Sequence, residues 1–168
     1  MGTQMEVLIK DPQTSLRLSR IRQRDTGAEL VVRRLIFRAG IRFRTRNTDL
    51  PGSPDIANRA RKWVVFVHGC FWHRHSGCER ATTPKRNRQF WLDKFAANRR
   101  RDQRVERQLR RCGYKVIVVW ECEARRRNLR PLTSRLRRQL IQAEGTRSVR
   151  RRPNPRRSKD RAGLGEHT

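Results

Sequence analysis

Acidic residues are scarce in this chain of 168 residues: 15 Asp and Glu stand against 43 Lys and Arg, which gives a formal net charge of +28. Such an excess favours a polyanionic partner, with nucleic acid as the first candidate and an anionic membrane surface as the second. Hydrophobic residues are also few, at 35%. We therefore expect one domain with a compact core and a heavily charged surface.

Long apolar runs and secretory features are absent as well. No apolar stretch approaches the roughly 20 residues that a membrane-spanning helix needs. The first fifteen residues lack the basic start and long apolar segment of a signal peptide. We therefore expect a cytosolic protein with no membrane partner. Thiols stay reduced there, so the four cysteines favour metal binding over a disulfide scaffold.

The order of predicted elements indicates an α/β domain with a small mixed sheet. A helix is expected over 26–40, because Thr26 and Glu29 have the spacing of a capping box. Gly40 provides its stop signal. Periodicity predicts the other elements, which are strands over 41–46, 62–67 and 115–120 and helices over 89–111 and 132–141.

Three parts are expected along the chain. Residues 1–15 form a flexible leader, residues 16–144 form the folded domain, and residues 145–168 form a basic, disordered tail that is poor in residues able to pack. The arginines of the tail either add sequence-independent affinity for nucleic-acid phosphates or are simply solvated charge.

A candidate zinc site starts in the segment VHGCFWHRHSGC at 67–78. Cys70, His75 and Cys78 supply three of the four nitrogen or sulfur ligands that a structural zinc ion takes. Cys122 follows the second apolar strand, so it joins them if the two strands are parallel neighbours. Cys112 precedes that strand and is expected to lie apart. The alternative is that these residues are ordinary buried thiols and a surface histidine.

The same segment carries two further histidines, for which two interpretations stay open. His68 and His73 are either acid–base groups near a second metal, or a hydrogen-bonded strand-end residue and a spare zinc ligand. Asp55 precedes the strand that leads to His68, an arrangement that suits an oxygen-ligated Mg²⁺, although Pro-Asp is also common in turns. Glu29 has its own alternative as a helix cap.

Several blocks together resemble one known family. RDTGAE, DLPGSPD, FVHGCFWHRHSGC, FWLDKFAANRRRDQRV and GYKVIVVWECE, within residues 15–125, are similar to the very short patch repair (Vsr) DNA mismatch endonucleases. The resemblance implies a restriction-endonuclease-like three-layer α/β fold with a small mixed central sheet and a structural zinc site. It also implies that residues 16–144 form an endonuclease domain. This domain would nick one strand of duplex DNA 5′ to the thymine of a T·G mismatch, which arises from deaminated 5-methylcytosine.

The resemblance also implies roles for individual residues in Mg²⁺-assisted hydrolysis. Asp55 would bind Mg²⁺, and the main-chain carbonyl of Val67 would be a second ligand. Glu29 and His68 match residues that contact metal-bound water. His73 matches a histidine that either activates water or assists the reacting phosphate.

The zinc ligands and a DNA wedge are implied in the same way. Cys70, His75, Cys78 and Cys122 match the structural zinc ligands. Phe71 and Trp72 match an aromatic wedge that enters the DNA beside the mismatch, and Leu18 stands where an apolar residue intercalates from the other groove. The alternative for the two aromatic rings is core packing.

The resemblance implies that the partner is double-stranded DNA that contains a T·G mismatch, bound by a monomer, with other DNA-repair proteins as further partners. It also implies a location in the bacterial cytosol, associated with the nucleoid. Two alternatives belong to other functional classes. One is a zinc-stabilised DNA-binding protein without catalysis, and the other is a restriction-type nuclease that cuts matched DNA.

Overall fold

The computed structural model describes residues 24–145. Leu18, the expected leader and all but the first residue of the expected tail lie outside this range. The elements in chain order are α2 (Gly27–Arg38), β1 (Ile56–Asn58), β2 (Trp63–His68), α3 (Arg88–Arg111), β3 (Lys115–Trp120), α4 (Glu121–Ala124) and α5 (Arg130–Gly145). None of the helices in the described range combines the length and the apolar character needed to cross a membrane.

The sheet is small and mixed, as the sequence predicts. Its strand order is β1-β2-β3, with β1 antiparallel and β3 parallel to β2. The register of the parallel pair places Trp63 opposite Lys115 and His68 opposite Trp120. The carboxyl ends of β2 and β3 therefore lie side by side, and the segments that follow the two strands emerge from the same edge of the sheet.

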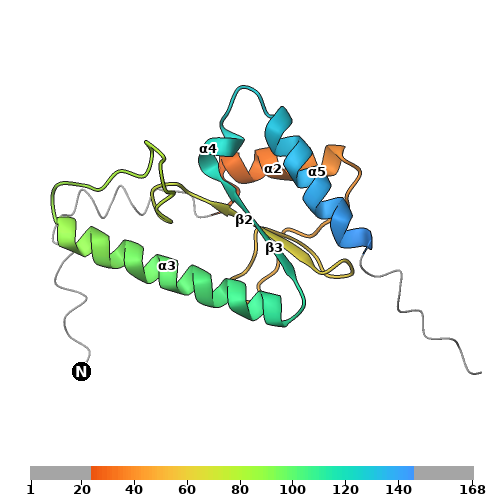
Figure 1. Cartoon of the computed structure of the whole chain (residues 1–168), viewed down its shortest axis with the longest axis horizontal. Helices are drawn as coiled ribbons and strands as arrows, with labels where there is room; N and C mark the ends of the chain where they lie inside the picture. Colours follow the sequence, from red (N-terminus) through yellow and green to blue (C-terminus); the bar gives the residue numbers. More distant parts are fainter. Residues whose placement is uncertain (1–23, 146–168) are drawn as a thin grey trace, which may run out of the picture.

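Helices cover both faces of the sheet. Figure 1 shows α3 along one side of β2 and β3, with α2, α4 and α5 on the other. Alternate residues of β2 serve the two layers: Trp63 and Val65 belong to the core beneath α2 and α5, whereas Val64 packs with Leu109 of α3. The α/β class and the small mixed sheet are thus confirmed. The likeness to restriction endonucleases stays a prediction.

Helix α2 is fixed at its start by the predicted cap. The side chain of Thr26 accepts a hydrogen bond from the backbone N–H of Glu29 at 3.3 Å, and the Thr26 hydroxyl donates to the Glu29 carboxylate at 3.0 Å. That carboxylate also accepts from the backbone N–H of Asp25 at 3.0 Å. Two of the donors at this helix end are satisfied by side chains, which stabilises the entry into α2.

The prediction of a strand over 41–46 is wrong. Only Arg44 pairs there, in an isolated bridge with Ala57, formed by backbone hydrogen bonds of 2.8 and 2.9 Å. The alternation of apolar and basic residues correctly indicated that one face of this segment is buried, since Ile41 is buried and Phe43 packs against the core. The neighbouring strand β1 is only three residues long, so segment 41–46 has few backbone groups to pair with. The sequence analysis also missed β1 itself.

Candidate active site and metal centre

The edge where β2 and β3 end gathers most of the candidate residues. His68 is the last residue of β2 and leads into the loop that carries Cys70, His73 and His75. Cys122 lies in α4, directly after β3. The parallel pairing of the two strands therefore brings together residues about 50 positions apart in the chain, as the sequence analysis expected for Cys122.

Three cysteines and one histidine form a compact group at this edge. The ligand atoms of Cys70, His75, Cys78 and Cys122 all lie within 4.8 Å of one another. The Nδ1 atom of His75 is 3.6 Å from the Cys70 sulfur and 3.3 Å from the Cys122 sulfur. A tetrahedral zinc ion separates its sulfur and nitrogen ligands by about 3.5 Å. The donor set and its spacing therefore fit a metal ion such as zinc.

The electrostatics of this group also suit a cation. Burial raises the pKa of the Cys70 thiol to about 12, and burial also raises the pKa of Cys122. A buried thiolate is unfavourable without a positive partner, and a metal ion is such a partner. The fourth cysteine, Cys112, is exposed and follows α3, so it lies apart from the group, as its position before β3 had indicated.

A second group lies on the α3 side of the same edge. Its members are His68, His73 and Asp102, with ligand atoms within 4.8 Å of one another. The Nδ1 atom of His73 is 2.5 Å from a carboxylate oxygen of Asp102. The rings of His68 and His73 are stacked, with centroids 3.9 Å apart and planes 9° from parallel. The structure therefore joins the two histidines and adds a carboxylate that the sequence analysis did not name.

Charges within this group are set by burial and by the Asp102 hydrogen bond. Burial and the neighbouring His73 lower the pKa of His68 to about 4, so His68 is neutral at physiological pH. Burial by itself would raise the pKa of Asp102, but the hydrogen bond from His73, together with the positive charges of His73, His68 and Arg101, holds that pKa below its usual value. An ionised Asp102 accepts the Nδ1–H of His73, which leaves Nε2 of a neutral ring free to take a proton.

Trp120 connects the two groups. Its ring stacks on His75 with centroids 4.2 Å apart and planes 8° from parallel, and it meets the His68 ring edge-on at 5.5 Å. The indole thus stands between the cysteine group and the histidine pair. We infer that the metal centre and the histidine group are held in a fixed relation, because both pack on the same aromatic ring.

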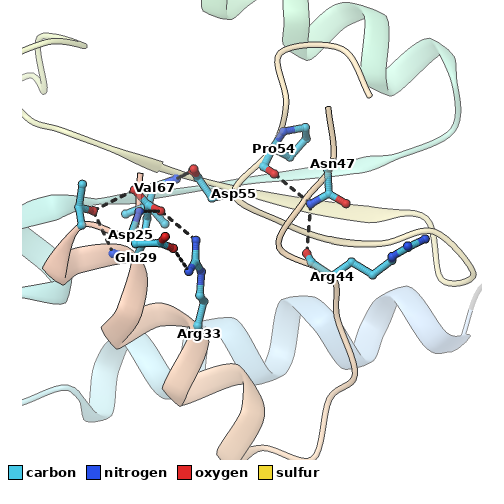
Figure 2. A network of polar contacts seen from close by, with 9 residues as sticks. Asp25, Glu29, Arg33, Arg44, Asn47, Pro54, Asp55 and Val67 are labelled. Atoms are coloured by element: carbon cyan, nitrogen blue, oxygen red, sulfur yellow. Dashed lines mark hydrogen bonds and ion pairs between the residues drawn. The ribbon is translucent and has the colours of Figure 1, made fainter. Parts of the chain in front are cut away.

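Asp55 lies at the same edge of the sheet, as the residue directly before β1. Its Oδ2 atom accepts the backbone N–H of Val67 at 2.7 Å, as Figure 2 shows. β1 begins only at Ile56, so at this position the carboxylate, and not a strand residue, accepts that N–H. Burial raises the pKa of Asp55 to about 6, and the nearby Glu29 adds to the rise. A partly buried carboxylate with an elevated pKa is typical of functional sites.

Glu29 is occupied as a helix cap. It is only 4% exposed, and its carboxylate accepts from Thr26, Asp25 and Arg33, the last at 3.0 Å. A carboxylate offers about four acceptor positions, so three hydrogen bonds leave one. The capping role is therefore confirmed, and a further contact toward Asp55 is compatible with it. Figure 2 shows this network between α2 and the Asp55 segment.

The aromatic pair is neither fully buried nor free-standing. Phe71 and Trp72 are both partly exposed. The Phe71 ring meets Trp91 and Phe95 of α3 edge-on, at 5.4 and 5.1 Å, and Asn98 of the same helix donates to the Trp72 carbonyl at 3.1 Å. Side chains in the first half of α3 thus pack against the Phe71 ring and hold the backbone at Trp72. Sequence reasoning did not identify this support, because the apolar spacing in α3 only indicated a buried helix face.

Comparison with known proteins adds family membership to this geometry. The family model of the DNA mismatch endonuclease Vsr matches residues 5–80. The chain is 47% identical over 106 residues to the type II nicking enzyme V.XorIIP of Xanthomonas oryzae, which covers 63% of this chain and 77% of that enzyme. It is 39% identical over 107 residues to the DNA mismatch endonuclease Vsr of Escherichia coli, which covers 64% of this chain and 68% of that protein. The chain therefore belongs to the Vsr family of DNA mismatch endonucleases.

Proposed function

We propose that this protein nicks one strand of duplex DNA on the 5′ side of the thymine in a T·G mismatch, by Mg²⁺-assisted phosphodiester hydrolysis. Family membership makes it a DNA endonuclease of mismatch repair. The mismatch and the metal are the finer parts of the proposal, since relatives that carry the name of type II nicking enzymes are more similar in sequence, at 47% and 45% identity, than the mismatch endonuclease at 39%. The protein would act as a monomer in the cytosol, together with other DNA-repair proteins.

The arrangement of Asp55 supports a metal-assisted reaction. The carboxylate has one oxygen on the Val67 N–H, which leaves the other for a cation. The main-chain carbonyl of Val67 belongs to the same residue and would be a second oxygen ligand, as hard cations require. A bound Mg²⁺ supplies a Lewis acid that offsets the charge developing on the phosphate. Glu29 and His68 would orient water in this space.

His73 is the best candidate for moving a proton. Its Nδ1 side is occupied by Asp102, so Nε2 is the atom able to accept a proton from water or to donate one to the reacting phosphate. His68 stacks on the ring and restricts its rotation. The single observation that carries the proposal is that Asp55 accepts the Val67 N–H at the sheet edge where the stacked His68 and His73 follow, beside the metal-binding loop and the aromatic pair.

Recognition of a mismatch is a test of how easily the duplex deforms. A T·G pair differs little in outline from a matched pair, so indirect readout is needed. Unstacking one step costs on the order of a few kcal/mol, and stacking a base on an aromatic ring returns roughly 1–3 kcal/mol. Phe71 and Trp72 would act as the wedge. The metal centre at Cys70 and the α3 rings beneath them would keep the wedge rigid, and Leu18 would enter from the other groove.

A strand-resolved cleavage assay tests the function. Duplexes with one T·G pair in varied flanking sequences, each labelled on either strand, should be nicked only 5′ to the mismatched thymine with Mg²⁺ and not in EDTA. A matched T·A duplex is the control and should remain uncut under the same conditions. Equal cutting of the matched duplex would indicate a restriction-type nuclease. Binding without any cutting would indicate a DNA-binding protein that lacks catalysis.

We also expect one zinc ion per chain, bound by Cys70, His75, Cys78 and Cys122. Cys122→Ser should lose the zinc and a large part of the thermal stability, because a structural zinc site contributes directly to folding. Cys112→Ser is the matched control, since this cysteine is exposed and apart from the group, and it should keep one zinc. Elemental analysis of both purified variants decides the point. Equal zinc content in the two would contradict the ligand assignment.

A further inference from the structure

One buried asparagine connects both ends of the loop that leads to Asp55. Asn47 is 2% exposed, and its side-chain Nδ2 donates to the carbonyl oxygens of Arg44 at 3.1 Å and Pro54 at 3.0 Å. Figure 2 shows the amide between these two carbonyls. Both partners are acceptors, so the NH₂ group must face them. Asn47 therefore joins Arg44, which forms the bridge to β1, to Pro54, which precedes Asp55.

Its neighbours restrict the loop further. The backbone N–H groups of Leu50 and Ser53 bond the carbonyls of Asn47 and Leu50, at 3.0 and 2.9 Å. Gly52 has a φ of +70°, and a Cβ added there would lie 2.4 Å from a methyl of Val105 in α3, so the loop closes tightly against that helix. Tight turns fix the middle of the loop, and the Asn47 amide fixes its two ends relative to each other.

The position of the Pro54 carbonyl determines the position of Asp55. The peptide bond between them is planar, so holding the Pro54 oxygen also holds the orientation of the Asp55 backbone N–H and Cα. From there the carboxylate reaches the Val67 N–H at 2.7 Å. A loss of the Asn47 contact would release one side of this arrangement while β1 and β2 remain paired.

The Asn47 side chain acts through its NH₂ group. Among the described residues, its buried Oδ1 has no hydrogen-bond partner, whereas Nδ2 donates to two carbonyls. An apolar side chain of similar size would leave the buried Pro54 carbonyl without this donor. The asparagine thus supplies two directed donors to the two ends of the loop.

We infer that Asn47 is a positioning residue for Asp55: its amide fixes the Pro54 carbonyl and thereby aims the free carboxylate oxygen at the cation. This rests on the proposed function in assigning Asp55 to the metal. Groups that support a ligand without touching the metal typically change metal affinity by about 10–100-fold. Asn47 would change the metal affinity by a similar factor, although it would contact neither the DNA nor the metal.

Asn58 offers a matched control. Its Nδ2 donates to the carbonyl of Arg42 at 2.9 Å, so it joins the same preceding segment to β1 by the same kind of bond. It is the last residue of β1, at the end away from Asp55. A purely structural role for these amides predicts similar effects at both positions, whereas a positioning role predicts an effect at Asn47 only.

The experiment uses Mn²⁺ as the probe ion and needs no catalysis. Binding of Mn²⁺ to the DNA-free, zinc-loaded protein is measured by electron paramagnetic resonance for the wild type, Asn47→Ala, Asn47→Leu and Asn58→Ala. We expect at least about tenfold weaker binding in both Asn47 variants and unchanged binding in Asn58→Ala. Exchange of the Val67 amide hydrogen, which the Asp55 carboxylate covers, should accelerate in the Asn47 variants alone.

The Leu variant guards against a failure to fold, because it fills the space and removes the unpaired Oδ1. Wild-type Mn²⁺ affinity together with wild-type Val67 exchange in a folded Asn47 variant overturns the inference. An equal loss in Asn58→Ala overturns it as well. Failure of the proposed function looks different: the wild type would bind Mn²⁺ but not nick T·G duplexes, or Asp55→Asn would bind Mn²⁺ normally.

Discussion

Replacing Asp55 with Asn is expected to reduce T·G nicking by about a thousandfold or more while raising the stability of the metal-free protein near neutral pH. Loss of a single group that stabilises transition-state charge costs about 100–1000-fold, and loss of a metal ligand removes more than one such contribution. An amide can still accept the Val67 N–H, so the local backbone should be retained. Binding to a T·G duplex in EDTA should change little.

The stability gain follows from the pKa of Asp55. Burial raises it from 3.8 to about 6, so the folded state holds a proton that the unfolded state has already released. The protonated carboxyl stabilises the fold below pH 3.8, and this contribution is lost as the pH rises through about 6. At pH 7.5 the ionised group lowers the free energy of unfolding by about 1–3 kcal/mol, the smaller value allowing for partial exposure. Asn carries no such charge.

Thermal unfolding at two pH values separates these effects. For zinc-loaded protein without added Mg²⁺, Asp55→Asn should melt higher than wild type at pH 7.5, and the difference should shrink strongly at pH 4. Asp49→Asn is the control, because Asp49 is exposed and forms an ion pair with Arg59. It should leave nicking intact. Nicking by Asp55→Asn at the wild-type rate would show that this carboxylate does not hold the catalytic metal.

The parts of the site that sequence could predict have local signals. The Thr26–Glu29 cap is a pattern within four residues, and the structure forms it. The two apolar strands are short continuous runs, and their parallel pairing was sufficient to expect Cys122 beside Cys70. Cysteine and histidine at metal-binding spacing are informative because few other roles require that combination.

The parts that were missed depend on tertiary contact. Asp102 lies 29 residues beyond His73, in a helix whose sequence is dominated by arginine, so nothing local distinguishes it from a solvated charge. Asn47 looks like an ordinary turn residue, and only its burial shows otherwise. The strand over 41–46 was mispredicted since alternation reports burial of one face and carries no information about how much of a partner strand is available.

Replacing Asp102 with Asn is expected to lower the rate of nicking at saturating DNA by about a hundredfold or more, the usual contribution of a positioned acid–base group. Asn can present its NH₂ to His73, which would favour the tautomer with the proton on Nε2. The ring would then offer no lone pair on that side. Because Asp102 bonds His73 and is not a member of the cysteine group, we expect the KM for DNA and the zinc content to remain unchanged.

Asp93→Asn is the matched control on the same helix, since Asp93 is exposed and accepts only from Gln89 among the contacts described for it. It should nick at the wild-type rate. Nitrogen-15 NMR of the imidazole groups supplies a readout independent of activity: in wild type the Nδ1–H of His73 should give a protected, downfield proton signal, and Asp102→Asn should lose it. An unchanged rate together with an unchanged signal would show that the pair does not set the tautomer.

The stacking of His68 on His73 explains why the reaction would depend on the Asp102 carboxylate. Rings 3.9 Å apart would repel each other if both carried a proton charge, and burial keeps His68 neutral, with a pKa of about 4. A proton that His73 accepts during the reaction is therefore offset by Asp102, whose carboxylate oxygen lies 2.5 Å from Nδ1. In Asp102→Asn, His73 keeps the neutral His68 ring on one face but loses the carboxylate that orients it. The step that uses Nε2 of His73 should therefore be the one that slows.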